Sequence, residues 1–171
     1  RERSIGIGAL GFHAYLQKKS MPFECAMAKV LNNRIFSHIK TKVDEANLQL
    51  GSERGEAPDA EGTGRRFSHT MAIAPNASSS IIMGNTSPSI EPYRANAYRQ
   101  DTLSGAFLNK NKYLVALIDK KIELGATKLD ADEIWSSIIA NDGSVQHLRW
   151  LQPEEKDVFK TAMEIDQRWI I

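Results

Sequence analysis

The sequence has little cysteine, little net charge and no long apolar run, and each shortage excludes a class of protein. Cys25 is the only cysteine among 171 residues, so an internal disulfide or a cysteine-rich metal site is excluded, and a reducing compartment is expected. The formal net charge of +1 gives no strong field toward nucleic acid or an anionic membrane. No apolar run approaches the roughly 20 residues that a membrane-spanning helix needs. We therefore expect a cytoplasmic protein without nucleic-acid or membrane partners.

What is present suits a globular fold. Hydrophobic residues make up 42% and charged residues 25% of the chain, which is ordinary for a protein with one core. The chain opens on "RERS", without a methionine, and stops on "DQRWII", although termini usually end in polar residues. We therefore expect a piece of a longer polypeptide.

The clearest pattern predicts one long helix over residues 22–50. Apolar residues recur there every three or four positions, and Gly51 is suited to end the helix. The apolar face of this helix is predicted to consist of Phe23, Met27, Leu31, Ile35 and Ile39.

Three further helices are predicted in the second half of the chain. The first covers residues 111–123. The second follows the cap residue Asp130 and stops at Gly143. The third opens at Pro153, where two acids suit a helix N-terminus, and continues toward the last residue.

The middle of the chain mixes short apolar and polar stretches. Residues 51–66 are predicted to form a polar loop, and residues 67–74, "FSHTMAIA", fit a buried strand, with a helix as the open alternative. The stretch "SSSIIMG" fits a short helix with a serine cap and a glycine stop. Residues 85–100 contain two prolines and are predicted to be irregular. The residues therefore indicate a helix-rich α/β fold.

The strongest candidate for a binding site lies between residues 67–74 and the short helix. In "PNASSS", Pro75 to Ser80, small side chains allow several backbone N–H groups to converge on one anion, and the serine hydroxyls add donors. The alternative is an Asn/Ser turn that only caps a helix. The residues alone favour neither interpretation.

Other motifs are weaker. Gly6, Gly8 and Gly11 form G-x-G-x-x-G, but only "RERS" precedes them, whereas a dinucleotide fingerprint must follow a strand. The alternative is that these glycines allow the start of a helix to pack closely against a neighbouring segment. Cys25 is interpreted as a small helix residue. No two of the four histidines have the i, i+4 spacing of a helical metal site, so no metal site is expected.

Four motifs together resemble the large, catalytic subunit of class I ribonucleotide reductase, in detail nearest to phage and bacterial forms. They are "RSIGIGALGFHAYL", "GTGRRFSHTMAIAPNASSSII", "GNTSPSIEPYRANAYRQDTLSGAF" and "GSVQHL". The resemblance covers essentially the whole chain. It implies that residues 1–171 are a partial barrel domain, from the later part of the ten-stranded α/β barrel of that subunit.

The resemblance also implies an activity and a site. The family reduces ribonucleoside diphosphates to deoxyribonucleotides by thiyl-radical chemistry. In the family, the loop that matches "PNASSS" holds the diphosphate of the substrate. Carried over, this role falls to Asn76, Ala77, Ser78 and Ser79, with Ser80 as a weaker candidate.

The departures from the family pattern are equally informative. The finger-loop cysteine, the two barrel cysteines and the C-terminal cysteine pair are absent, and Cys25 stands in another context. The tandem tyrosines are expected after residue 171, and the nucleotide-sensing domain before residue 1. We therefore assign no catalytic residue or cofactor to this chain and expect the isolated chain to be inactive.

The resemblance further implies partners: a ribonucleoside diphosphate, the rest of the large subunit in a dimer, a small subunit with a radical-generating metallocofactor, and a thioredoxin or glutaredoxin reductant. Two alternatives stay open. One is a stand-alone phosphate- or nucleotide-binding module without turnover. The other is a helical interaction protein in which "PNASSS" only caps a helix.

Overall fold

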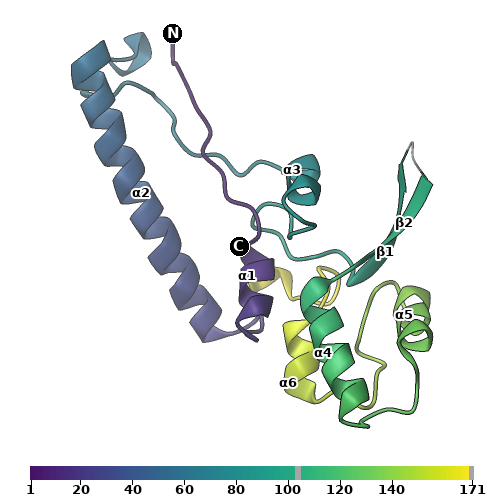
Figure 1. Cartoon of the computed structure of the whole chain (residues 1–171). Coiled ribbons are helices and arrows are strands. Elements are labelled where there is room, and N and C mark those ends of the chain that lie inside the picture. The colour runs from purple at the N-terminus through teal and green to yellow at the C-terminus, as the bar shows by residue number, and fades with distance from the viewer. Residues whose placement is uncertain (103–104, 170–171) are drawn as a thin grey trace.

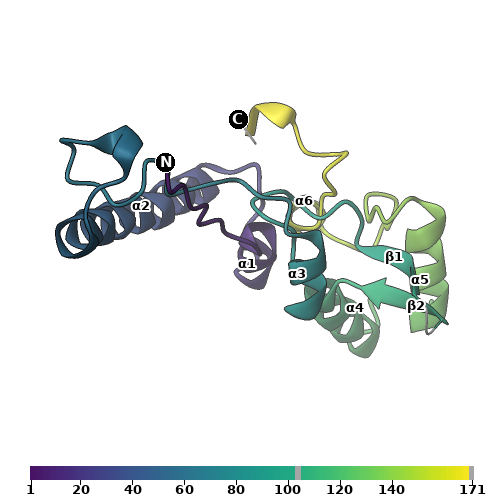
Figure 2. The ribbon, with the colours of Figure 1, turned by 90° about the horizontal axis from the view of Figure 1, so that it is seen from above.

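The computed structural model describes residues 1–102 and 105–169. In that part of the chain the helices and strands are, in order, α1 (Phe12–Lys18), α2 (Ala26–Arg54), α3 (Ala77–Ile82), β1 (Ala97–Thr102), β2 (Gly105–Lys110), α4 (Lys112–Glu123), α5 (Ala131–Ala140) and α6 (Pro153–Val158). Short 3-10 turns cover Pro58–Ala60 and Gln167–Trp169. The molecule is elongated: α2 occupies one end, the β1–β2 hairpin and α5 the other, and α1 and α3 lie between them (Figures 1 and 2).

Two apolar clusters hold these elements. The larger joins α4, α5 and α6 to the start of β1 and includes Leu114, Ile118, Ile134, Ile138 and Val158. The smaller packs α1 against the start of α2 and consists of Leu16, Phe23, Ala28 and Ile165, so it needs one residue from the far end of the chain. The C-terminal segment therefore returns to the N-terminal helices.

The long helix forms as predicted but with shifted ends. It begins at Ala26, because Cys25 is extended and its Sγ accepts a hydrogen bond from the Ala28 N–H at 3.4 Å. It also continues to Arg54, so the predicted stop at Gly51 was wrong. Gly51 serves close packing instead, since a Cβ there would lie 1.9 Å from the Gly64 carbonyl oxygen. The face prediction holds for Phe23, which is buried, and fails for Met27, whose exposed fraction is 62%; Leu31, Ile35 and Ile39 are half-buried.

The later helices divide into two that match their predictions and one that does not. α4 and α5 form where expected, although α5 ends at Ala140, before the predicted stop at Gly143, and Asp130 caps α5 in a reciprocal capping box with Glu133. The third predicted helix ends at Val158. The backbone beyond it binds other segments: Ala162 N–H donates to the Tyr93 carbonyl at 2.8 Å, and the Phe159 carbonyl accepts from Asn96 Nδ2 at 2.7 Å. These tertiary bonds replace the helical ones.

The strand predictions needed two corrections. Residues 67–74 form no named strand; Met71 makes a single parallel bridge with Ile7, supported by bonds from Ile5 N–H to His69 O (3.0 Å) and from Ala72 N–H to Ile7 O (3.2 Å). A strand needs a ladder of backbone partners, and this segment pairs with residues 5–7 on one side, while its first residue, Phe67, bonds to the Asn47 side chain on α2 instead. Residues 97–100, predicted to be irregular, instead belong to β1, which pairs antiparallel with β2.

The glycines of the G-x-G-x-x-G stretch confirm the close-packing interpretation. A Cβ on Gly6 would lie 2.9 Å from the Ala72 Cβ, and one on Gly8 would lie 2.8 Å from the Ala72 carbonyl oxygen. Gly11 caps α1 with φ +85°, and a Cβ there would lie 2.7 Å from Thr86 Oγ1.

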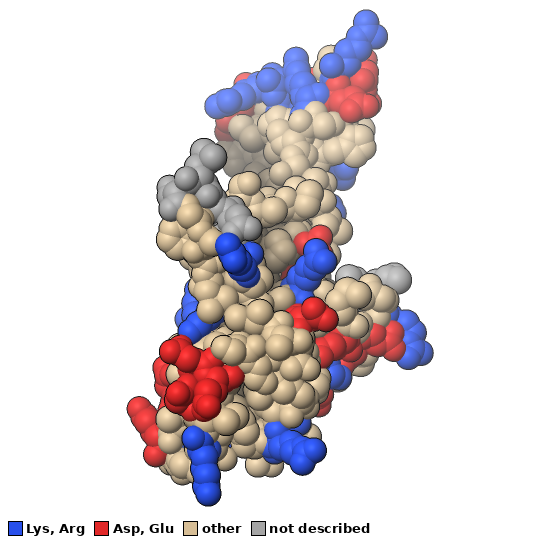
Figure 3. Space-filling model, turned by 90° about the vertical axis from the view of Figure 1, so that its right-hand side faces the viewer, with Lys and Arg blue, Asp and Glu red and all other residues tan. Residues whose placement is uncertain are grey.

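Charge is spread over the molecule. Figure 3 shows lysines and arginines on the same face as acids, with uncharged areas between them. Within residues 1–102 and 105–169, no helix is both long enough and apolar enough to cross a bilayer.

Candidate functional site

The candidate loop Pro75–Ser80 leads from the segment paired with Ile7 into α3 (Figure 1). Its last four residues form the first turns of that helix, and Asn76 occupies the N-cap position. The predicted serine cap was therefore wrong. The Asn76 side chain makes no capping hydrogen bond; the Asn76 backbone carbonyl accepts from the Ser80 N–H at 2.8 Å.

Two donors of the loop, the Ala77 N–H and the Ser80 hydroxyl, bond to carbonyl oxygens of the loop itself. The Ala77 N–H donates to the Pro75 carbonyl at 2.8 Å. The Ser80 hydroxyl donates to the Ala77 carbonyl at 2.7 Å, and Ser80 is buried. Ser80 therefore stabilises the turn, and its hydroxyl proton is not available to a ligand in this arrangement.

Ser78 and Ser79 differ from their neighbours. Both are exposed, and within the described part of the chain neither their backbone N–H groups nor their hydroxyls have a hydrogen-bond partner. Exposed N–H groups at the start of a helix carry partial positive charge and attract anions. The loop thus presents two adjacent backbone donors and two adjacent hydroxyls to one side.

No charged residue lies between Thr70 and Ile90. The loop therefore offers a negatively charged ligand neutral donors only. It also supplies no side chain that could act as a general acid, a general base or a nucleophile with an adjacent base. Such an arrangement can anchor an anion, and the chemistry on the ligand must come from other groups.

The loop is held from behind by residues that the sequence analysis did not single out. The turn after α3 bonds back to the helix, with Thr86 N–H donating to Ser80 O at 3.1 Å and Asn85 N–H to Ile81 O at 3.3 Å. The phenol of Tyr93 donates to the Asn85 carbonyl at 3.0 Å. Burial raises the pKa of Tyr93 to about 12, so this phenol stays a donor at neutral pH.

Tyr93 is fixed in turn by His13 on α1. The Tyr93 N–H donates to His13 Nδ1 at 3.0 Å, and the two rings lie 5.6 Å apart. Burial lowers the pKa of His13 to about 4, which keeps the imidazole neutral and Nδ1 free to accept. In sequence, no pattern distinguished His13 from the other three histidines, because its partner lies 80 positions away.

Neither metal-ligating side chains nor the apolar grooves add a second candidate site in the described part of the chain. Within residues 1–102 and 105–169, no three His, Cys, Asp or Glu side chains stand close enough to hold a metal ion. Two apolar grooves of about 470 and 350 Å³ lie beside α2, and no residue of the Pro75–Ser80 loop lines either of them.

Comparisons with known proteins agree on one family. The profile of the family described as "Ribonucleotide reductase, barrel domain" matches residues 1–63 and 58–171. The chain is 58% identical to the ribonucleoside-diphosphate reductase large subunit of Invertebrate iridescent virus 6, over 100% of this chain and 18% of that protein. It is 57% identical to the large subunit of Invertebrate iridescent virus 3, over 97% of this chain and 26% of that protein.

A solved structure matches as well. The class Id ribonucleotide reductase alpha subunit of Actinobacillus ureae superposes with a TM-score of 0.85 at 42% sequence identity, over 99% of this chain and 30% of that one. The chain thus spans less than a third of the length of each of these relatives.

Proposed function

The chain belongs to the ribonucleotide reductase family, as a segment of its barrel domain, and from this we propose that it works as part of a ribonucleoside-diphosphate reductase large subunit. Within that subunit, the loop of Asn76, Ala77, Ser78 and Ser79 binds the diphosphate of the substrate. The observation that carries the proposal is the pair of exposed residues Ser78 and Ser79, whose N–H groups have no acceptor among the described residues.

The proposed role is an anchor. A bound diphosphate fixes the ribose, and holding reacting groups in place is a large share of many enzymatic rate gains. The radical thiol and the redox cysteines belong to the rest of the subunit, because Cys25 is the only cysteine here and its Sγ accepts from Ala28 N–H. We therefore expect no turnover from these 171 residues alone.

The partners follow from the same proposal. The segment works with the rest of a dimeric large subunit, a radical-generating small subunit with a metallocofactor, and a thioredoxin or glutaredoxin reductant. It works in the cytoplasm, where a lone thiol stays reduced. Allosteric nucleotide binding belongs to other parts of the subunit.

The decisive variant is Ser79→Ala in a large subunit that contains this segment, assayed with its small subunit. A hydrogen bond to a charged group contributes about 1.5–3 kcal/mol, so KM for the ribonucleoside diphosphate should rise about ten- to a hundredfold. Thermal melting should change little. Ser136→Ala is the matched control, since Ser136 is an exposed serine on α5 and should leave both quantities unchanged.

The opposite outcome is equally clear. If Ser79→Ala lowers the melting temperature and leaves KM unchanged, the loop only caps α3 and the proposed function fails. Ala77→Asp gives a second measurement, because a carboxylate at this exposed position would repel the diphosphate. It should raise KM further than Ser79→Ala does.

A further inference from the structure

Tyr93 lies outside the loop that is proposed to bind diphosphate, yet the hydrogen bonds of that loop lead to it. The turn at residues 84–86 closes the end of α3: Gly84 and Asn85 donate backbone N–H groups to the Ile81 carbonyl, and Thr86 donates to Ser80. Both Gly84 (φ +80°) and Asn85 (φ +53°) are left-handed. A non-glycine residue in this region needs outside support to persist.

The Tyr93 phenol supports Asn85 by a hydrogen bond to its backbone carbonyl. It reaches the Asn85 carbonyl at 3.0 Å, while Asn85 Nδ2 donates to Asn109 Oδ1 on β2 at 2.9 Å. The remaining side-chain atom, Asn85 Oδ1, is buried without a hydrogen-bond partner among the described residues. Among the described residues, Asn85 is therefore linked through its carbonyl to Tyr93 and through its side-chain amide to the hairpin.

Tyr93 and the residues before it are in turn hydrogen-bonded to α1 and its N-cap. His13 Nδ1 accepts from the Tyr93 N–H at 3.0 Å. Ser87 adds a parallel connection, because its carbonyl accepts from Gly11 N–H at 2.8 Å and its hydroxyl accepts from Ala14 N–H at 3.1 Å. Both His13 and Ser87 are fully buried, so the segment that follows α3 is fixed to a rigid helix.

We propose that Tyr93 is a positioning residue: held by His13, it fixes the turn after α3 and thereby sets the direction of the Ser78 and Ser79 donors toward the substrate. This inference rests on the proposed diphosphate role of the loop. α3 has only six residues, about 9 Å at 1.5 Å per residue. A displacement of its C-terminal turn is therefore transmitted directly to its first turn.

The test is Tyr93→Phe in the assembled reductase, with KM, kcat and thermal melting measured for a ribonucleoside diphosphate. The ring and its packing remain, and one hydrogen bond to a carbonyl is lost. KM should rise about two- to tenfold, the range that one neutral hydrogen bond supports, and kcat should stay within about twofold. Tyr15→Phe is the control, because Tyr15 is 41% exposed on α1 and should change neither constant.

A double variant separates this inference from the proposed function. If Tyr93 acts through the loop, Tyr93→Phe combined with Ser79→Ala should raise KM by less than the product of the two single effects. An increase equal to the product overturns the positioning role, and so does an unchanged KM for Tyr93→Phe alongside a raised KM for Ser79→Ala. An unchanged KM for Ser79→Ala overturns the diphosphate role and, with it, this inference.

Discussion

His13 is a base that the fold keeps uncharged. Its side chain is fully buried between α1, Tyr93 and the ring of Phe23, which it meets edge-on at 5.5 Å. Because Nδ1 accepts from the Tyr93 N–H, a proton on Nδ1 would place two donors against each other. Burial lowers the pKa of His13 to about 4, although a hydrogen bond to the Val158 backbone acts in the opposite direction.

This lowered pKa predicts a dependence of stability on pH. An unfolded histidine titrates near 6.5, so between about pH 6.5 and pH 4 the unfolded chain binds one proton more than the folded chain. Stability is fully present above pH 6.5 and declines as the pH falls toward 4. The lowered pKa corresponds to about 3 kcal/mol. Urea unfolding of the 171-residue chain at pH 7 and pH 4.5 measures it.

His13→Asn is the informative comparison, since an amide oxygen can accept from the Tyr93 N–H but takes up no proton in this range. The variant should be less stable at pH 7, where packing is lost, and its stability should vary less between pH 7 and pH 4.5. An equal loss on acidification in both proteins would assign the effect to the carboxylates instead.

At the scale of elements, α2 depends on a glycine inside the helix. Gly51 lies in the last turns of α2, where the chain returns across it at Gly64 and Arg66. The returning loop is fixed by Glu56, whose carboxylate accepts from the Gly62 N–H at 2.5 Å and the Gly64 N–H at 2.6 Å. Arg66 ties this loop to α2, since its N–H donates to the Asn47 carbonyl at 3.2 Å and its guanidinium donates to the Arg54 carbonyl at 2.7 Å, so the loop cannot retreat from Gly51 without breaking these bonds.

Gly51→Ala should therefore destabilise the chain, although alanine favours helix over glycine by about 1 kcal/mol. The added Cβ would lie 1.9 Å from the Gly64 carbonyl oxygen, and overpacking of this kind typically costs about 1–3 kcal/mol. Denaturant unfolding measures the change. Ser52→Ala, one position along on the exposed face of α2, should be neutral or slightly stabilising. A stabilised Gly51→Ala variant would show that the loop moves aside freely.

Elements with local signals were predictable from sequence, and elements that depend on distant partners were not. Asp130 was predicted to cap α5 from its residue type alone, and it does so in a reciprocal capping box with Glu133, three residues on. The end of α6 is set by Tyr93 and Asn96, more than 60 positions away. The candidate loop lies between these extremes: its composition left an anion site and a helix-capping turn equally open, and the sequence did not distinguish the exposed donors of Ser78 and Ser79 from the internally bonded Ser80.

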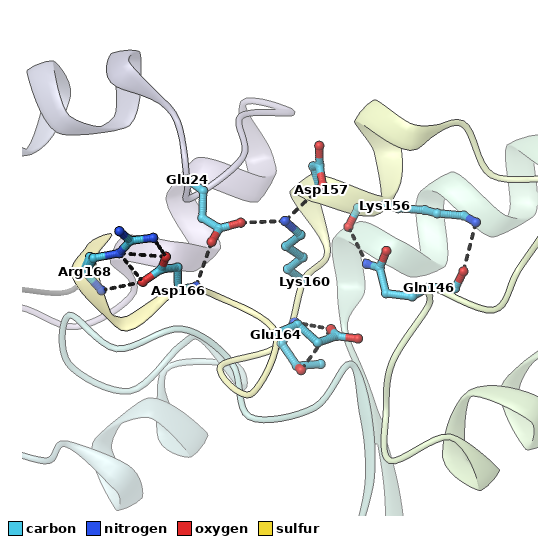
Figure 4. A network of polar contacts seen from close by, with 9 residues as sticks. Glu24, Gln146, Lys156, Asp157, Lys160, Glu164, Asp166 and Arg168 are labelled. Carbon is cyan, nitrogen blue, oxygen red and sulfur yellow. Dashed lines mark hydrogen bonds and ion pairs between the residues drawn. The ribbon is translucent and has the colours of Figure 1, made fainter.

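At the scale of the whole molecule, a half-buried ion pair between Glu24 and Lys160 joins the two ends of the chain. Glu24, just before α2, binds Lys160 Nζ at 2.5 Å and accepts from the Asp166 N–H at 2.7 Å (Figure 4). Burial alone would raise the pKa of the Glu24 carboxyl, but these two hydrogen bonds outweigh it and hold the pKa below its usual value.

Glu24→Ala should loosen the segment from Lys160 to Trp169. Loss of two hydrogen bonds to a charged, largely buried carboxylate should lower the free energy of unfolding by about 2 kcal/mol, and the amide hydrogen of Asp166 should exchange faster. Asp157→Ala is the control, because Asp157 contacts the same Lys160 at 3.2 Å but its side chain is 50% exposed. It should cost less than about 0.5 kcal/mol. If the two variants lowered the free energy of unfolding equally, the Glu24 contacts with Lys160 and Asp166 would not be what holds the C-terminal segment.

The position of Ile165 in the smaller cluster has a consequence for synthesis on the ribosome. Leu16, Phe23 and Ala28 are synthesised well before Ile165, and their cluster is completed only when Ile165 follows. At about 5–20 residues per second, that wait lasts roughly seven to thirty seconds. For this time the nascent N-terminal helices present an incomplete apolar surface, which chaperones recognise, whereas the cluster around α4 and α5 closes from neighbouring residues as soon as they appear.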